Sequence, residues 1–205
     1  MWIFRISFFI FEKLFLSNAN KNGRNMNLCP IDGETDLFWK SFLSLYQESF
    51  PDYERRPLSD LTRLLEMQKS RYRLLAILED DRFVGFFGLW SFDRYVYVEH
   101  FAVASENRGT GVGTKALRML QERENLPFVL EVEPPIDEQT RRRVSFYERM
   151  GFRMSDVYYW QPPYSPSLEG MELRLMFYRQ GEIAGIKEII HAIHAVVYNY
   201  HDPEC

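Results

Sequence analysis

The sequence predicts an α+β fold around one mixed β-sheet, and three observations support this prediction. The apolar pattern begins with helical spacing, changes to strand-like runs, and then alternates between the two. The three consecutive strands in the middle are joined by short turns that suit antiparallel hairpins. A glycine-rich turn then opens a helix that is followed by another strand, a βαβ unit whose strands pair in parallel. We therefore expect a mostly antiparallel sheet with one parallel pair and flanking helices.

Each element is predicted from its local pattern. The helices have apolar residues at three- and four-residue spacing, and Pro51, Pro57 and Gly151 mark helix ends. The helices are predicted at residues 37–50, from 57 onward, and at 114–124, 138–150 and 183–200. The strands are rich in β-branched and aromatic residues between turn residues. They are predicted at residues 26–31, 73–79, 83–90, 95–103, 128–133, 152–161 and 172–179.

Length and charge limit the domain organisation and the partners. A chain of 205 residues is long enough for one full core, and we expect a single domain at residues 26–205 that includes the C-terminal helix. Lys and Arg total 25 against 29 Asp and Glu, so the sequence predicts no nucleic-acid or anionic-membrane partner. Cys29 and Cys205 match no zinc or redox spacing, which favours the cytoplasm and no bound metal.

Residues 1–25 are predicted to lie outside the core domain. The first 16 residues are strongly apolar, but Arg5 and the pair Glu12–Lys13 interrupt them. No uninterrupted run therefore approaches the ~18 residues that a membrane span needs. Two interpretations stay open: a translated leader upstream of a true start at Met26, which we favour, or an amphipathic helix packed on the domain or on a membrane surface.

Three glycines in five residues predict a ligand site at the start of the third helix. Gly109, Gly111 and Gly113 let the backbone approach a ligand, and the helix N-terminus offers unpaired N–H groups and a partial positive charge. This combination suits a phosphate or pyrophosphate. The spacing matches neither a Walker P-loop nor G-x-G-x-x-G. The alternative interpretation is a tight connection between strand and helix.

Two motifs give the chain a family resemblance. Residues 108–113 read Arg-Gly-Thr-Gly-Val-Gly and match the R/Q-x-x-G-x-G/A signature of the GNAT superfamily of acetyl-CoA-dependent N-acetyltransferases. Residues 147–152 resemble the family's second motif, Y-x-x-x-G-F, at the end of a helix. The resemblance covers roughly residues 26–179. It implies the GNAT-like acyl-CoA N-acyltransferase fold, in which the fourth and fifth strands, a parallel pair, splay apart to admit acetyl-CoA.

The resemblance also implies the cofactor-binding residues. Amides of the glycine turn would hold the pyrophosphate, the backbone at 101–103 would pair with the pantetheine arm, and the N–H of Val103 would polarise the thioester carbonyl. Tyr147 stands where many relatives protonate the departing CoA thiolate, whereas Thr140 stands where relatives often have Asn. The implied set is Phe101, Ala102, Val103, Arg108, Gly109, Thr110, Gly111, Val112, Gly113, Thr114 and Thr140.

Glu99 is the candidate base, because an amine must lose a proton before it can attack. Strand alternation predicts that Glu99 shares a face with Tyr97, Phe101 and Val103, whereas His100 points the other way as a structural histidine. A carboxylate among apolar neighbours is expected to have a raised pKa. The alternative is a carboxylate at a strand edge that pairs with a basic residue.

Three further carboxylates are candidates for binding the acceptor. Glu131 and Glu133 share a face of their strand, where they could hold a cationic acceptor, act with Glu99 on the proton, or mark a strand end that reaches solvent. Glu54 lies in the segment that overhangs the acceptor site in relatives. Arg55 and Arg56, in the same segment, could bind an acceptor carboxylate or phosphate, or form a solvated turn.

The predicted activity is direct transfer of an acetyl group from acetyl-CoA to a primary amine, with CoA as the product. No acyl-enzyme is expected, because neither cysteine lies in a nucleophile motif. The acceptor is a small-molecule or peptide amine, and the sequence leaves a homodimer open. The alternative from another class is a non-catalytic acyl-CoA-binding or interaction module of the same fold.

Overall fold

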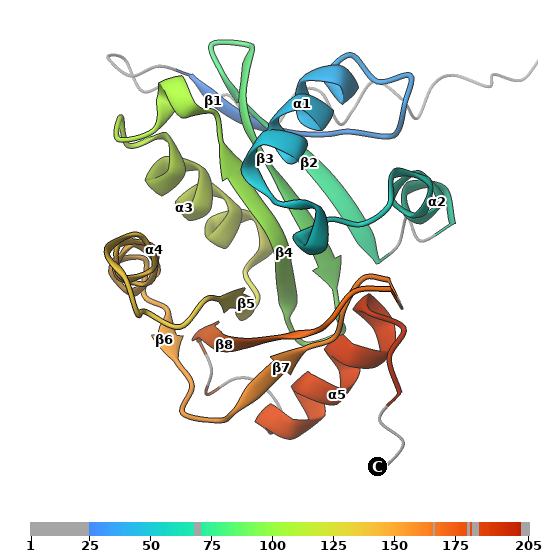
Figure 1. Cartoon of the computed structure of the whole chain (residues 1–205). Coiled ribbons are helices and arrows are strands. Elements are labelled where there is room, and N and C mark those ends of the chain that lie inside the picture. The colour runs from blue at the N-terminus through green and yellow to red at the C-terminus, as the bar shows by residue number, and fades with distance from the viewer. Residues whose placement is uncertain (1–24, 68–70, 166, 180, 182–184, 202–205) are drawn as a thin grey trace, which may run out of the picture.

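The computed structural model describes residues 25–67, 71–165, 167–179, 181 and 185–201, so nearly all of the predicted leader lies outside the described residues. A mixed sheet with helices on both faces forms the structure (Figure 1). The strands are β1 Met26–Pro30, β2 Tyr72–Glu79, β3 Arg82–Ser91, β4 Val96–Val103, β5 Phe128–Val132, β6 Arg153–Met154, β7 Tyr159–Gln161 and β8 Met171–Tyr178. The helices are α1 Trp39–Ser49, α2 Leu58–Met67, α3 Val112–Glu124, α4 Glu138–Arg149 and α5 Ile186–Val197, with short 3-10 turns η2 Asp52–Glu54 and η3 Ser105–Asn107.

The strand order confirms the predicted fold class. The strands lie in the order β1-β2-β3-β4-β5-β8-β6, and β7 also pairs with β8. Every pairing is antiparallel except that of β4 with β5, which is parallel. The parallel pair is the one that the βαβ unit around α3 predicts.

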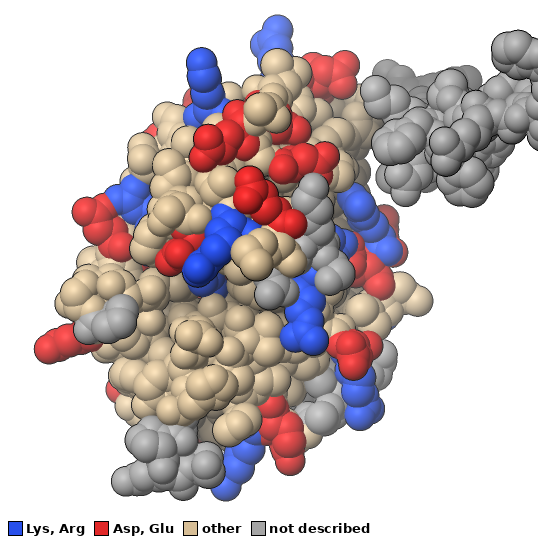
Figure 2. All heavy atoms as spheres, turned by 90° about the vertical axis from the view of Figure 1, so that its right-hand side faces the viewer, with Lys and Arg blue, Asp and Glu red and all other residues tan. Residues whose placement is uncertain are grey.

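Two apolar cores form, one on each face of the sheet. Helices α1, α2 and α5 pack on one face, where aromatic side chains such as Phe42 and Phe86 lie edge to face with ring centroids 4.8 Å apart. Helices α3 and α4 cover the other face. Seen from the side of α2, acidic and basic side chains are intermixed, so this side shows no large area of one charge (Figure 2). None of the helices in the described ranges combines the length and the apolar composition that a bilayer crossing needs.

The parallel strands separate soon after they begin. β4 and β5 pair only through Val96, Tyr97 and Val98, which face Phe128, Val129 and Leu130. β4 then continues to Val103 along β3 alone, which leaves its other edge without a paired strand among the described residues. This separation agrees with the splayed strands that the resemblance implies.

A β-bulge in β4 corrects the predicted alternation. Gly88 faces His100 and Leu89 faces Val98, so Glu99 is an extra residue without an opposite partner. Phe101 and Val103 consequently pack on the α3 and α4 side, whereas Tyr97 and Ala102 belong to the other core. Glu99 and His100 both face the α1 side: Glu99 contacts Arg56, and the His100 ring lies 5.0 Å from that of Tyr46. The prediction that Glu99 and His100 point in opposite directions was therefore wrong.

The strand predicted at 152–161 is interrupted. β6 pairs with β8 through Arg153 and Phe177, whereas β7 pairs through Tyr159 and Leu173. The register shifts by two residues between these pairs, and the extra residues form a short loop. In this loop the hydroxyl of Ser155 accepts a 3.0 Å hydrogen bond from the backbone N–H of Val157. A side chain that bonds its own backbone competes with strand pairing at this point.

Candidate active site

A cleft of about 890 Å³ occupies the gap between β4 and β5. The start of α3 and the side of α4 form its outer wall, and the η2 turn and the residues around β7 reach it from the other face of the sheet. It brings together predicted site residues from five segments of the chain: Glu54, Glu99, Phe101, Ala102, Val103, Arg108, Gly109, Gly111, Gly113, Thr114, Glu131, Glu133 and Tyr147.

The glycine turn exposes backbone donors to this cleft. Gly109 and Gly111 have positive φ angles of 75° and 88°, which glycine adopts without strain. Gly111 caps α3, and the first N–H groups of that helix have no carbonyl one turn earlier to bond. A Cβ atom at Gly109 or Gly111 would meet nothing within 4 Å, so a ligand can approach this backbone closely.

The free edge of β4 supplies a second row of backbone groups. Ala104 donates a 2.9 Å backbone hydrogen bond to Val84 of β3, and alternation therefore turns the N–H groups of Phe101 and Val103 away from β3 toward the cleft. The carbonyl of Val103 accepts a 2.9 Å hydrogen bond from Nε of Arg108, which holds the glycine turn against the strand. The N–H of Val103 is therefore available to a ligand that enters the cleft.

These groups fit the cofactor that the resemblance implies. The amides at the start of α3 would hold phosphate oxygens, and the unpaired edge at 101–103 would take an extended amide-bearing arm as if it were a strand. Arginine side chains line the same side of the cleft and favour an anionic ligand. They are Arg108, Arg142, Arg143 and Arg149.

Three predicted cofactor residues do not line the cleft. The side chain of Val112 is buried in the core under α3. The hydroxyl of Thr110 donates a 2.7 Å hydrogen bond to the carbonyl of Asn107 and so closes the turn. Thr140 is buried in a capping box: its N–H donates to Oδ1 of Asp137 at 2.7 Å, and its hydroxyl accepts from the N–H of Asp137 at 3.1 Å. Its neighbour Gln139 lines the cleft instead.

Tyr147 lies on the last turns of α4 with its side chain on the cleft wall. The residue is only 9% exposed, and its ring packs edge to face against Phe146 and Phe152. Burial raises the pKa of the Tyr147 hydroxyl to about 12, although the nearby charge of Arg143 lowers it. The hydroxyl therefore keeps its proton at neutral pH and is able to donate it.

Glu99 forms a buried ion pair with Arg56. Nε of Arg56 donates to Oε1 of Glu99 at 2.7 Å, the hydroxyl of Tyr164 donates to the same oxygen at 3.1 Å, and the indole of Trp90 donates to Oε2 at 3.0 Å. Burial alone would raise the pKa of Glu99, but the Arg56 charge and the bonds from its neighbours lower it to about 2. The expected raised pKa was wrong, because the sequence does not show that Arg56 reaches this carboxylate.

His100 lies beside this ion pair and also lines the cleft. Its Nε2 is 3.1 Å from the carbonyl of Glu54, an atom that only accepts hydrogen bonds. Its Nδ1 is 3.7 Å from Oε2 of Glu99. The ring packs edge to face on Tyr46 and Phe50 at the end of α1, and together with the contact to Glu54 it holds this part of the chain against β4. This arrangement agrees with the structural role that the sequence predicts.

Glu131 is the centre of a second polar cluster, on β5. The hydroxyl of Tyr159 donates to its Oε1, Nε2 of Gln161 donates to its Oε2 at 2.6 Å, and the hydroxyl of Tyr198 donates to the same oxygen at 2.9 Å. Burial raises the pKa of Glu131, and these hydrogen bonds only partly oppose the increase. No Lys or Arg forms an ion pair with Glu131 in the portion of the chain that is described.

Glu54 and Glu133 both line the cleft, on η2 and just beyond β5. Burial raises the pKa of Glu54, and the negative charge of Glu133 raises it further. Glu133 itself forms an ion pair with Arg143 of α4. The cleft thus has a third and a fourth carboxylate besides Glu99 and Glu131, and only Glu54 and Glu131 lack a direct ion pair with an arginine among the described residues.

The sequence does not reveal the partners of these carboxylates. Arg56 lies 43 positions before Glu99, and Tyr198 lies 67 positions after Glu131. No local motif links residues at such separations, since only the folded sheet and α5 bring them together. The two consecutive arginines at 55 and 56 were the one available signal, and they did not indicate which of the two turns inward.

A family model and one curated relative match the sequence of this chain. The model described as Acetyltransferase (GNAT) family matches residues 38–152, more than half of the chain. YjbC of Bacillus subtilis (strain 168), whose own assignment as an acetyltransferase is provisional, is 30% identical over 118 residues. That match covers 56% of this chain and 56% of YjbC, so the chain spans little more than half of that relative.

Solved structures share the fold. One from Bacteroides thetaiotaomicron, provisionally assigned as a GNAT acetyltransferase, is 33% identical with a TM-score of 0.79 and covers 85% of this chain and 99% of its own. Arabidopsis thaliana Naa50, solved with the bisubstrate analogue CoA-Ac-MVNAL, has a TM-score of 0.53 at 17% identity and covers 74% of this chain and 97% of its own. The motifs, the splayed strands and the family match lead to one conclusion: the chain belongs to the acetyltransferase (GNAT) family.

Proposed function

We propose that the chain transfers the acetyl group of acetyl-CoA directly to a primary amine. One observation carries this proposal: a single cleft joins the backbone donors of β4 and α3 to the carboxylates on the other side of the gap between β4 and β5. Acetyl-CoA supplies the reactive thioester when it is bound. The N–H of Val103 stabilises negative charge on the carbonyl oxygen, and the hydroxyl of Tyr147 gives its proton to the leaving sulfur.

We propose that Glu131, rather than Glu99, accepts the proton that the amine loses. A pKa of about 2 makes Glu99 a poor proton acceptor, because the positive charge of Arg56 stabilises its ionised form. The pKa of Glu131 is raised by burial, and its side chain also lines the cleft. A carboxylate with a raised pKa takes up a proton more readily near neutral pH. Glu99 then serves to hold Arg56 and the bulge of β4 in place.

The acceptor is proposed to be a small-molecule or peptide amine whose positive charge is attracted by Glu54 and Glu133. Both carboxylates line the cleft, and they come from different parts of the chain. Related folds support both classes: one neighbour is a spermidine N-acetyltransferase chimera with a TM-score of 0.57, and Naa50 was solved with a peptide-bearing analogue. We place the reaction in the cytoplasm, because the two cysteines match no disulfide framework.

A labelled acetyl-CoA assay over a panel of amines and peptides, read by mass spectrometry, tests this proposal. Wild type is expected to acetylate at least one amine, and Glu131→Gln and Tyr147→Phe should each lower kcat by about 10²-fold or more. Acetyl-CoA at 100 times its Kd should stabilise all three proteins by about 2.7 kcal/mol. Stabilisation without transfer to any amine would instead identify a non-catalytic acyl-CoA-binding module.

A further inference from the structure

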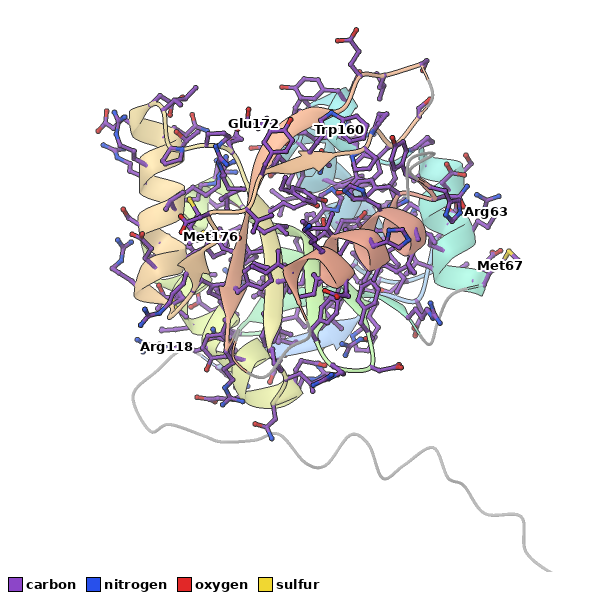
Figure 3. The ribbon with its side chains drawn as sticks, turned by 90° about the horizontal axis from the view of Figure 1, so that it is seen from below. Arg63, Met67, Arg118, Trp160, Glu172 and Met176 are labelled. Atoms are coloured by element: carbon purple, nitrogen blue, oxygen red, sulfur yellow. The ribbon has the colours of Figure 1, made fainter. Side chains whose placement is uncertain are left out.

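The C-terminal end of α5 packs on the face of the sheet opposite α3 and α4, and the next residue, Tyr198, bonds to Glu131, which lines the cleft. Seen from below, α5 crosses in front of the sheet beside β7 and β8, with Trp160 on the neighbouring strand (Figure 3). Ile189, Ile193 and Val197 anchor the helix in the core. The helix lies outside residues 38–152, the part of the chain that matches the family model. The contacts of α5 therefore add features that the family motifs do not include.

Val197 and Tyr198, two consecutive residues at this end, are linked by hydrogen bonds to the two splayed strands. The carbonyl of Val197 accepts a 2.5 Å hydrogen bond from Nη2 of Arg56, whose Nε holds Glu99 of β4. The hydroxyl of Tyr198 donates to Oε2 of Glu131 on β5 at 2.9 Å. One short segment thus connects the carboxylate of the first splayed strand with that of the second.

The hydroxyl of Tyr198 takes part in three hydrogen bonds. It accepts a 2.8 Å hydrogen bond from Nε2 of Gln161, which also donates to Glu131 at 2.6 Å. The hydroxyl of Tyr97 lies 3.1 Å away, and because the Tyr198 proton is directed to Glu131, Tyr97 is the donor in this pair. Tyr198 is only 8% exposed, so no bulk water replaces these bonds. The Glu131 carboxylate is consequently held in one orientation.

We propose that Tyr198 is a positioning residue for acetyl transfer: its hydroxyl orients Glu131 toward the cleft and stabilises the charged carboxylate that accepts the proton of the amine. This role rests on the proposed function of Glu131. The titratable groups that face Glu131 are Tyr97 of β4, Tyr159 of β7 and Tyr198 itself. Burial raises the pKa of all three tyrosines, so they stay neutral hydrogen-bond donors through the range in which Glu131 titrates.

The test is Tyr198→Phe, which removes one hydroxyl and keeps the ring that packs on Tyr164 at 5.1 Å. Loss of a donor destabilises the charged carboxylate, so the pKa of Glu131 should rise by about one unit. Carbon-detected NMR titration of the glutamate carboxyls in the full chain measures this shift directly, with Glu131→Gln to assign the resonance. The measurement needs no acceptor and no turnover.

The rate profile should follow the titration. With an amine from the panel, the acid limb of the pH profile of kcat should move to higher pH by the same amount. At pH values above this limb, kcat should be within about twofold of wild type. The Kd for acetyl-CoA should not change. Tyr200→Phe is the matched control, because Tyr200 lies two residues further on and packs edge to face on Trp160 of β7, with ring centroids 5.3 Å apart, instead of bonding to Glu131.

The outcomes separate this inference from the proposed function. An unshifted Glu131 resonance in active Tyr198→Phe enzyme overturns the role of Tyr198 alone. A shifted resonance with an unchanged acid limb shows that Glu131 does not accept the proton, which overturns both. A parallel shift of resonance and acid limb, absent in Tyr200→Phe, supports the proposal, since a purely structural role for the hydroxyl would change stability without moving the profile.

Discussion

The two sides of the cleft are built from different parts of the chain. The backbone donors of the cofactor side come from residues 101–114, one continuous segment, and α4 adds arginine side chains to them. The acceptor side uses side chains from η2, β4, β5, β7 and the end of α5, joined by hydrogen bonds across as many as 141 residues. Changes on the first side should therefore alter ligand affinity, whereas changes on the second should also alter the stability of the fold.

The buried ion pair on the acceptor side should give the largest effect. Removing Arg56 leaves Glu99 charged and buried, and we expect Arg56→Met to lower the free energy of unfolding by about 3–5 kcal/mol. Urea unfolding at neutral pH measures this loss. Arg63→Met is the control: Arg63 lies on the outer side of α2, and the 66% exposure of its side chain predicts a change within about 0.5 kcal/mol.

Acid titration sharpens the same prediction. The folded pKa of Glu99 is about 2, below its ordinary value of 4.5, so the pair stabilises the fold fully above the ordinary value. This contribution is lost as the pH falls from 4.5 toward 2, because the carboxylate must then take up a proton. Wild type should lose stability over this range, and Arg56→Met should lose much less. Equal acid sensitivity in the two proteins would contradict the ion pair.

The difference between the two sides of the cleft also explains which features of the fold and the site could be predicted from the sequence. The parallel pair, the glycine turn and the position of Tyr147 depend on neighbouring residues or on short motifs, and the sequence contains them. The faces of His100, Phe101 and Val103 relative to Glu99 were predicted wrongly, because strand alternation fails at a β-bulge and no residue marks the bulge in the sequence. The partners Arg56 and Tyr198 depend on the packing of η2 and α5, which periodicity does not determine.

On the cofactor side, substitutions of Gly113 and Gly111 should have different effects. A Cβ at Gly113 would lie 3.6 Å from both Phe101 and Val103, an ordinary contact, so Gly113→Val should fold but narrow the cleft and lower acetyl-CoA affinity about 100-fold or more. Gly111→Val should instead lose about 1–3 kcal/mol of stability, because φ is 88° there. Calorimetry and thermal melting separate the two effects. Gly113→Ala, with one methyl, should fall between wild type and Gly113→Val in affinity, and tight binding by Gly113→Val would place the phosphates elsewhere.

The smallest effect is expected at Thr140, where the resemblance implies a cofactor contact and the structure has a helix cap. The Thr140 hydroxyl bonds Asp137 within the capping box and does not line the cleft. Thr140→Ala should therefore cost about 1 kcal/mol of stability and leave the Kd for acetyl-CoA unchanged. Gln139→Ala is the matched opposite, since Gln139 lines the cleft and takes no part in the cap through its side chain. The affinity for acetyl-CoA should fall in Gln139→Ala with little loss of stability. A tenfold weaker Kd in Thr140→Ala would show that the Thr140 hydroxyl contacts the cofactor after all.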